Sequence, residues 1–278
     1  MLYLCLAILS SAAIALLMRI SSGKVSAKLS MLGVNYIVCA LLGALYCNFD
    51  LFCPTVPGFA PMTVMGIVSG FLYLGGFVLC QWNSQHNGIV MTSVFMKLGL
   101  LVPMALSVLL FRELPSPVQI IGFCLALAAI LLINLKKDTG ANRFRWQLVA
   151  MLLFCGSSEA MAKVFEVVGT PTLANQYLFY TFAVALALCA LLVICKKERP
   201  GIPELLFGIA IGVPNFFSAK FLLLSLKDLP AVVVFPSFSI TTMLIATLAG
   251  VLLFKERLQK LQWVAMAGII LALFLLNI

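Results

Sequence analysis

The chain of 278 residues is 63% hydrophobic and only 10% charged, whereas soluble domains typically contain about 25% charged residues. Its polar side chains could not cover a soluble globule, so the composition excludes a soluble protein and predicts an integral membrane protein. The net charge of +9 does not indicate a nucleic-acid partner, because the basic residues gather in short loops between apolar segments, where membrane orientation requires them.

Ten apolar segments follow one another along the chain, and most have the length of roughly 17 to 25 residues that a membrane-spanning helix needs. Only helices and closed barrels satisfy their backbone polar groups in lipid, and these segments lack the alternation of barrel strands. The sequence therefore predicts an all-α membrane protein with ten transmembrane helices. We expect these helices at 2–18, 29–47, 61–81, 88–111, 117–135, 147–168, 173–195, 203–226, 230–254 and 259–277.

The loops between these segments differ in charge, and the difference predicts the orientation of the chain. The loops that follow 2–18, 117–135, 173–195 and 230–254 hold thirteen basic residues, whereas the loops on the opposite side hold two. The thirteen are Arg19, Lys24, Lys28, Lys136, Lys137, Arg143, Arg145, Lys196, Lys197, Arg199, Lys255, Arg257 and Lys260, and the two are Arg112 and Lys227. Basic loops stay in the cytoplasm, so both termini are predicted to lie outside, in a plasma (inner) membrane.

The end of the chain repeats a stretch near its middle. Phe111, Glu113, Gln119, Ala129, Leu132 and Asn134 recur, without a gap, as Phe254, Glu256, Gln262, Ala272, Leu275 and Asn277. Such a repeat indicates one unit written twice, with a first five-helix repeat over 1–138 and a second over 143–278. Because five is odd, the second repeat must cross the membrane in the opposite sense, as in the inverted repeats of secondary transporters.

Two helix junctions, Phe111-Arg112-Glu113 and Phe254-Lys255-Glu256, and the run from Ala249 to Arg257 resemble the EamA-like branch of the drug/metabolite transporter superfamily. The resemblance covers essentially the whole chain. It implies a carrier whose central cavity is lined by the expected helices at 2–18, 61–81, 88–111, 147–168, 203–226 and 230–254, with 117–135 and 259–277 at the periphery. The family's substrates include amino acids, nucleotide precursors, sugars, quaternary amines and drugs, so the resemblance does not name the substrate.

Ionisable side chains within the apolar segments are the first candidates for substrate binding, because each costs about 2.5–3.5 kcal/mol to insert. Glu159 and Lys163 lie one turn apart in 147–168, where they either line the cavity or neutralise each other as a structural pair. Lys97 lies too deep in 88–111 to reach the interface easily, and we expect it to meet an anionic substrate group or Glu159. Lys220 in 203–226 either binds substrate or extends toward the outer headgroups.

Three uncharged residues complete the predicted substrate site. Asn215 follows Pro214, which can kink a helix, and its amide binds either a ligand or a neighbouring helix. Tyr73 and Phe238 either line an aromatic cavity or serve in helix packing or at the membrane interface. Proline residues inside helices, including Pro103, are expected to form bends. Gly66 and Gly70 match Gly208 and Gly212 and predict close helix packing, whereas Glu113 and Glu256 are interpreted as structural caps.

No catalytic or metal site is expected. The only histidine, His86, has no companions at metal-ligand spacing, and the chain contains no nucleotide-binding loop or nucleophile elbow. A disulfide between Cys47 and Cys53 is an open alternative to free thiols.

We therefore expect a secondary transporter, not an enzyme, that moves a small polar metabolite such as an amino acid by alternating access, without a cofactor. An exporter of hydrophobic or cationic drugs is the alternative, followed by a non-transporting membrane subunit or enzyme. The expected partners are the lipid bilayer and a small-molecule substrate, and whether the chain forms a homodimer is open.

Overall fold

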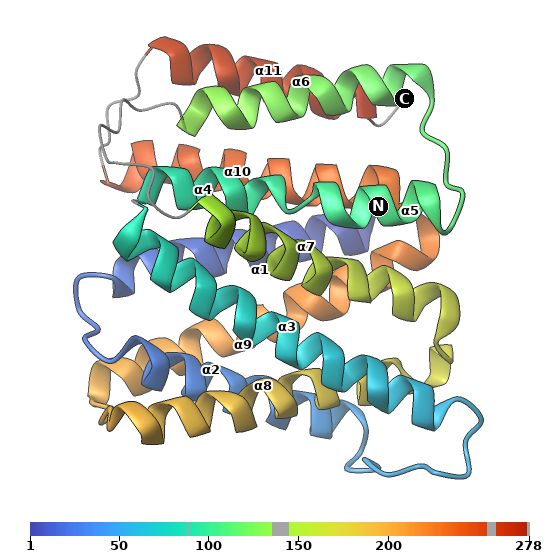
Figure 1. Cartoon of the computed structure of the whole chain (residues 1–278), viewed down its shortest axis with the longest axis vertical. Helices are drawn as coiled ribbons and strands as arrows, with labels where there is room; N and C mark the ends of the chain where they lie inside the picture. Colours follow the sequence, from blue (N-terminus) through green and yellow to red (C-terminus); the bar gives the residue numbers. More distant parts are fainter. Residues whose placement is uncertain (88, 135–144, 255–259, 277–278) are drawn as a thin grey trace. The chain divides into compact units, whose positions relative to one another are not determined.

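The computed structural model describes residues 1–87, 89–134, 145–254 and 260–276. Within these ranges the chain is helical, and its helices follow one another as the apolar segments predict (Figure 1). Their bounds are α1 Leu2–Ser21, α2 Lys28–Tyr46, α3 Phe59–His86, α4 Ile89–Leu98, α5 Leu101–Leu109, α6 Pro117–Asn134, α7 Arg145–Val168, the 3₁₀ turn η1 Pro171–Leu173, α8 Ala174–Lys196, α9 Ile202–Asp228, α10 Ala231–Phe254 and α11 Lys260–Leu276.

The main difference from the predicted helices is a break in the segment 88–111, which forms two helices, α4 and α5. Pro103 explains the break, because a proline has no N–H for the carbonyl four residues earlier and its ring clashes with that carbonyl. The carbonyl of Gly99 instead accepts the N–H of Val102 at 3.0 Å, a bond of the tighter 3₁₀ type. Pro214 and Pro236, by contrast, lie inside the uninterrupted helices α9 and α10.

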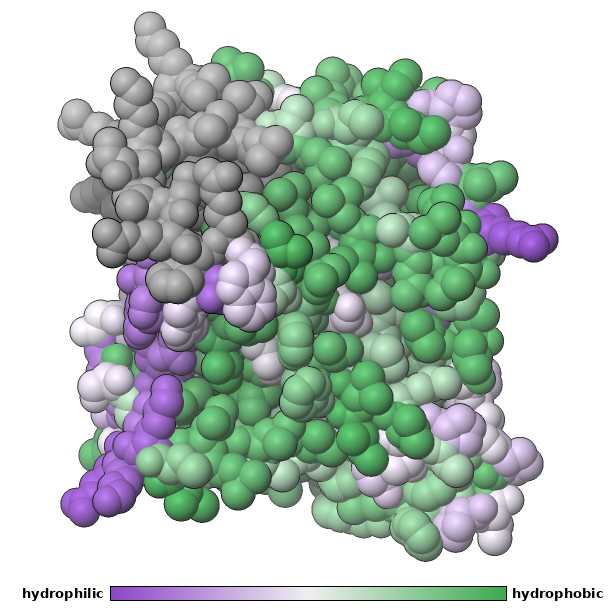
Figure 2. Space-filling model, in the orientation of Figure 1, coloured by the Kyte–Doolittle hydropathy of each residue, from purple (hydrophilic) through white to green (hydrophobic). Residues whose placement is uncertain are grey.

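Seven of the described helices are long and apolar enough to cross a membrane, and three shorter helices are also apolar. The face in Figure 2 is hydrophobic over most of its coloured surface, and its strongly hydrophilic residues lie near helix ends. A chain with so many apolar helices is a multi-pass membrane protein.

His86 is the last residue of α3 rather than part of a loop, and its ring stacks on Trp82.

The two cysteines beyond the end of α2, Cys47 and Cys53, are both buried free thiols. Burial raises the pKa of the Cys47 thiol to about 11, so the thiol stays protonated at neutral pH. Because thiol reactivity depends on the thiolate, Cys47 is expected to react slowly.

The helices form two compact units, each drawn from both parts of the chain, which we call unit 1 (residues 1–74 and 164–227) and unit 2 (residues 75–163 and 228–278). In unit 1, α2 and α8 pack along each other (Figure 1). In unit 2, α6 and α11 do the same. Ala129 and Ala272, which correspond in the sequence repeat, are both buried in the core of unit 2.

The two glycine pairs bring helices of unit 1 into close contact. A Cβ atom added at Gly66 would lie 2.8 Å from the Cβ of Tyr180, and one added at Gly70 would lie 2.8 Å from the Cβ of Val184, so α3 packs tightly on α8. The second pair does the same between α9 and α2: a Cβ at Gly212 would lie 2.6 Å from the Cβ of Val38 and 3.0 Å from a backbone oxygen. The predicted role of these glycines in packing is confirmed.

Replacing Gly212 with alanine should therefore destabilise the protein, because the new methyl group meets a backbone atom and a branched Cβ that cannot move aside. We expect a loss of about 1–3 kcal/mol, the usual cost of overpacking, measured by denaturant unfolding of the purified protein in detergent. The matched control is Gly23→Ala, since a Cβ at Gly23 has no atom within 4 Å. Equal stability of the two variants would contradict the packing described here.

Candidate functional site

The predicted substrate-binding residues fall into two groups, one in each unit. Unit 2 contains Lys97, Glu159, Lys163 and Phe238, and unit 1 contains Tyr73, Asn215 and Lys220. We describe the two groups in turn, because each has its own contacts.

The break between α4 and α5 places backbone directly against α7. A Cβ added at Gly99 would lie 3.3 Å from the nitrogen and 3.5 Å from the Cα of Gly156, and a Cβ added at Gly156 would overlap the carbonyl of Gly99. Only two glycines permit this approach of two backbones. Lys97 lies two residues before the break, in the last turn of α4, and Glu159 lies three residues after Gly156 on α7.

Lys97 and Glu159 are thereby brought close enough to interact electrostatically. They do not form a direct ion pair: within the described residues, neither takes part in an N–O contact of 4.0 Å or less. The Oε2 atom of Glu159 is buried and has no hydrogen-bond partner among the residues that the structure places. Buried polar atoms normally have partners, so this oxygen keeps Glu159 a candidate for ligand binding.

Lys163 has a different partner from the one that its position on α7 suggested. Its Nζ atom lies 2.7 Å from Oε1 of Glu113, so the intrahelical pair with Glu159 is replaced by an ion pair to the segment between α5 and α6. The other oxygen of Glu113 accepts the backbone N–H of Ala231 at 2.8 Å, at the first residue of α10. Glu113 is thus the structural cap that was predicted, although the helix that it caps is α10. Glu256, the second predicted cap, lies outside the described residues.

In unit 1, Asn215 lies in a chain of hydrogen bonds between buried and half-buried side chains. Its Oδ1 atom accepts the hydroxyl of Tyr73 at 3.0 Å, and its Nδ2 atom donates to Oδ1 of Asn35 at 3.1 Å. Asn35 also lies within 3.7 Å of the thiol of Cys39, which donates to a backbone carbonyl of α9. Sequence reasoning missed Asn35, although an amide in the middle of an apolar segment is itself a signal, because a polar group in lipid needs a partner.

The remaining two candidates pack against their own units. The ammonium group of Lys220 lies 3.0 Å from the ring centre of Tyr46, the last residue of α2, a cation–π contact. Phe238 is buried in α10. Substrate contact by either residue stays a prediction.

Three comparisons with known proteins bear on the class of this chain. Residues 146–278 match the EamA-like transporter family. An uncharacterized protein of Haemophilus influenzae is 24% identical over 284 residues, which cover 97% of this chain and 95% of that protein. A solved crystal structure of a protein superimposes with a TM-score of 0.79 at 18% identity, covering 99% of this chain and 94% of that one; it shows the shared fold.

Residues 146–278 therefore form an EamA-like transporter domain. The chain is similar in fold to the solved structure along almost its entire length. The match of residues 146–278 to this family confirms the resemblance drawn from the two junction motifs.

The ion pair between Lys163 and Glu113 predicts a large effect on stability. Glu113→Gln should destabilise the protein by about 3–5 kcal/mol, because it breaks a buried ion pair by removing one partner. The double variant Glu113→Gln with Lys163→Met should recover part of this loss, since the buried ammonium is removed as well.

Denaturant unfolding in detergent measures both variants, with Asp228→Asn as a control for the loss of an exposed carboxylate. If Glu113→Gln unfolds at the same denaturant concentration as Asp228→Asn, the ion pair contributes nothing to the fold.

Proposed function

We propose that the protein is a secondary transporter of a small polar metabolite that carries a carboxylate and an amino group, such as an amino acid. The observation that carries this proposal is the arrangement of Lys97 and Glu159, which interact electrostatically without a direct ion pair. A zwitterionic solute can join the two side chains: its carboxylate binds the ammonium of Lys97, and its ammonium binds the buried Oε2 of Glu159. Hydrogen bonds between charged groups are about twice as strong as those between neutral ones.

The broken helix supports the same location. Discontinuous helices recur at the substrate sites of secondary transporters, where freed backbone groups and helix ends contact substrates and ions. Here the break at Gly99 and Leu100 begins two residues after Lys97, and it contacts α7 about one turn before Glu159. Lys163, Asn215, Lys220, Tyr73 and Phe238 keep their place as predicted substrate contacts, whereas the hydrogen bonds of Asn215 and the ion pair of Lys163 also give these two residues structural roles.

We also propose that the chain is an inverted repeat of two five-helix parts, 1–138 and 143–278, that move by alternating access. Packing within the units supports this proposal. Helices that correspond in the two parts pack on each other, α2 with α8 and α6 with α11. The glycine contacts are reciprocal as well, because α3 packs on α8 through Gly66 and Gly70 while α9 packs on α2 through Gly208 and Gly212. A two-fold axis in the membrane plane produces such reciprocal contacts.

A second candidate function is the export of hydrophobic or cationic drugs. The observation that favours it is the aromatic cluster of unit 1, in which the rings of Tyr36, Tyr73, Phe182 and Phe216 contact one another. The two functions differ in their need for Lys97, because a cationic drug has no group that an ammonium would bind. A non-transporting subunit or a membrane enzyme would show no flux of any solute.

Transport by the purified protein in proteoliposomes, measured over a panel of amino acids, organic anions and cationic drugs, tests the proposal. We expect Lys97→Gln and Glu159→Gln each to reduce the uptake of a zwitterionic solute by about tenfold or more, which is the loss expected for one charge-assisted hydrogen bond. Lys227→Gln and Glu166→Gln are matched controls with the same chemical changes elsewhere, and both should transport normally.

Normal transport of the zwitterion by both site variants would show that the site lies elsewhere. Loss of transport in Glu159→Gln alone, together with uptake of cationic drugs, would favour the second function.

The predicted orientation has its own test, in a variant without native cysteines. Phe49→Cys follows the C-terminal end of α2 and Lys197→Cys follows the C-terminal end of α8, and both positions are exposed. A membrane-impermeant maleimide should label Phe49→Cys in intact cells and Lys197→Cys only after permeabilisation. The reverse pattern would place the termini inside.

A further inference from the structure

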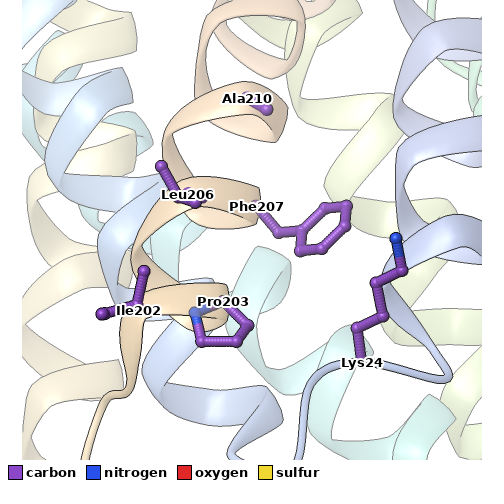
Figure 3. Close-up of a pocket in the computed structure, with 6 residues that line it drawn as sticks. All are labelled: Lys24, Ile202, Pro203, Leu206, Phe207 and Ala210. Carbon is purple, nitrogen blue, oxygen red and sulfur yellow. The ribbon is translucent and has the colours of Figure 1, made fainter.

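A hollow of about 430 Å³ opens beside the beginning of α9, in unit 1 (Figure 3). It is lined by Lys24, Ile202, Pro203, Leu206, Phe207 and Ala210. Five of these residues come from α9, and Lys24 comes from the loop after α1. Figure 3 shows the ring of Phe207 extending toward the side chain of Lys24.

The α9 side of this groove is an apolar stripe. Its residues recur at helical spacing from Ile202 to Ala210, a rise of about 12 Å along the helix. Ile202 is 74% exposed and Leu206 is 61% exposed, on a helix that is long and apolar enough to cross a membrane. Phe207 packs against the buried cluster that contains Ile211, so the inner side of the stripe is part of the packed interior of unit 1. Its outer surface fits a hydrocarbon chain.

Lys24 brings a positive charge to one end of the groove. The Nζ atom of Lys24 lies 5.9 Å from the ring centre of Phe207. Three more basic residues precede α9 in the chain, and among the described residues none of the four forms an ion pair. These three are Lys196, Lys197 and Arg199.

The two acidic residues of this region form hydrogen bonds with backbone groups at the beginning of α2 and no ion pair with these four basic residues, which outnumber them. Oε1 of Glu204 accepts the N–H groups of Ser26 and Ala27 at 3.1 and 3.2 Å. Oε2 of Glu198 accepts the N–H of Ser30 at 3.1 Å. Carboxylates at the N-terminus of a helix complement its dipole, so both side chains stabilise the beginning of α2.

We propose that this groove binds one anionic phospholipid, whose phosphate contacts Lys24 and whose acyl chain lies along the apolar stripe of α9. The ammonium of Lys24 matches the phosphate of a lipid headgroup. The exposed apolar stripe, about two helical turns long, matches the acyl chain that is joined to it. Basic residues at the edge of transmembrane helices are the usual contacts of anionic headgroups. This lipid site is separate from the residues proposed for transport, so its test does not depend on the substrate.

The test uses the purified full-length protein in detergent with an equimolar mixture of phosphatidylglycerol and phosphatidylcholine of the same acyl chains. Native mass spectrometry measures how much of each lipid stays bound. Wild-type protein should prefer phosphatidylglycerol by about fivefold, the effect expected of one lysine near an anionic headgroup. Lys24→Gln should bind the two lipids equally, and Lys227→Gln, at the other end of α9, should keep the preference.

A second variant, Leu206→Ser, tests the stripe and should weaken binding of both lipids, while Lys24→Arg should keep the preference and thereby confirm that the site tolerates substitution. Equal binding of the two lipids by wild-type protein would overturn the proposal, as would a preference that survives in Lys24→Gln. Displacement of phosphatidylglycerol by millimolar inorganic phosphate would also overturn it, because it would identify a site for free phosphate rather than for a lipid.

Discussion

A polar group without a partner is costly in hydrocarbon, and this cost determines the arrangement of the whole chain. A helix satisfies its backbone groups internally, which is why the described segments that could enter a membrane are helical. The exceptions occur at helix ends, and there the structure supplies partners from distant parts of the sequence. Glu204 and Glu198 accept N–H groups at the beginning of α2, and Glu113 accepts one at the beginning of α10. Three acidic residues are thus used to hold helix ends within their units.

The break between α4 and α5 is where this rule is relaxed. Pro103 removes one donor, and the chain compensates with 3₁₀-type bonds and with close backbone packing of Gly99 on Gly156. Irregular backbone at membrane depth is tolerated where it is buried in protein or lines a cavity. The break is packed against α7. It lies beside Lys97 and Glu159, which do not form a direct ion pair with each other. An irregularity that would only be destabilising elsewhere therefore coincides with the residues that we propose bind a solute.

Much of the fold could be predicted from the sequence, because each helix is a local consequence of an apolar segment of sufficient length. The glycine contacts were predictable for the same reason, since a small residue every four positions marks a helix face. The partner of Lys163 was not predictable, because local spacing favours Glu159, whereas the three-dimensional fold brings Glu113 to it from fifty residues away. The role of Asn35 was hidden for a similar reason: its hydrogen bond to Asn215 joins positions separated by 180 residues.

The two lysines of unit 2 show how the same chemistry can have different consequences. Lys163 is buried with a carboxylate 2.7 Å away, and that carboxylate is fixed further by a backbone N–H. Such a pair is already satisfied, so a solute would have to displace Glu113 in order to bind. Lys97 and Glu159 interact without reaching ion-pair distance, and an oxygen of Glu159 remains without a partner. Desolvated charges that are incompletely paired are costly, and a solute that carries both charges offsets this cost when it binds. The cost of an unpaired charge in the membrane is therefore itself a source of affinity, which favours Lys97 and Glu159 over Lys163 as the centre of the transport site.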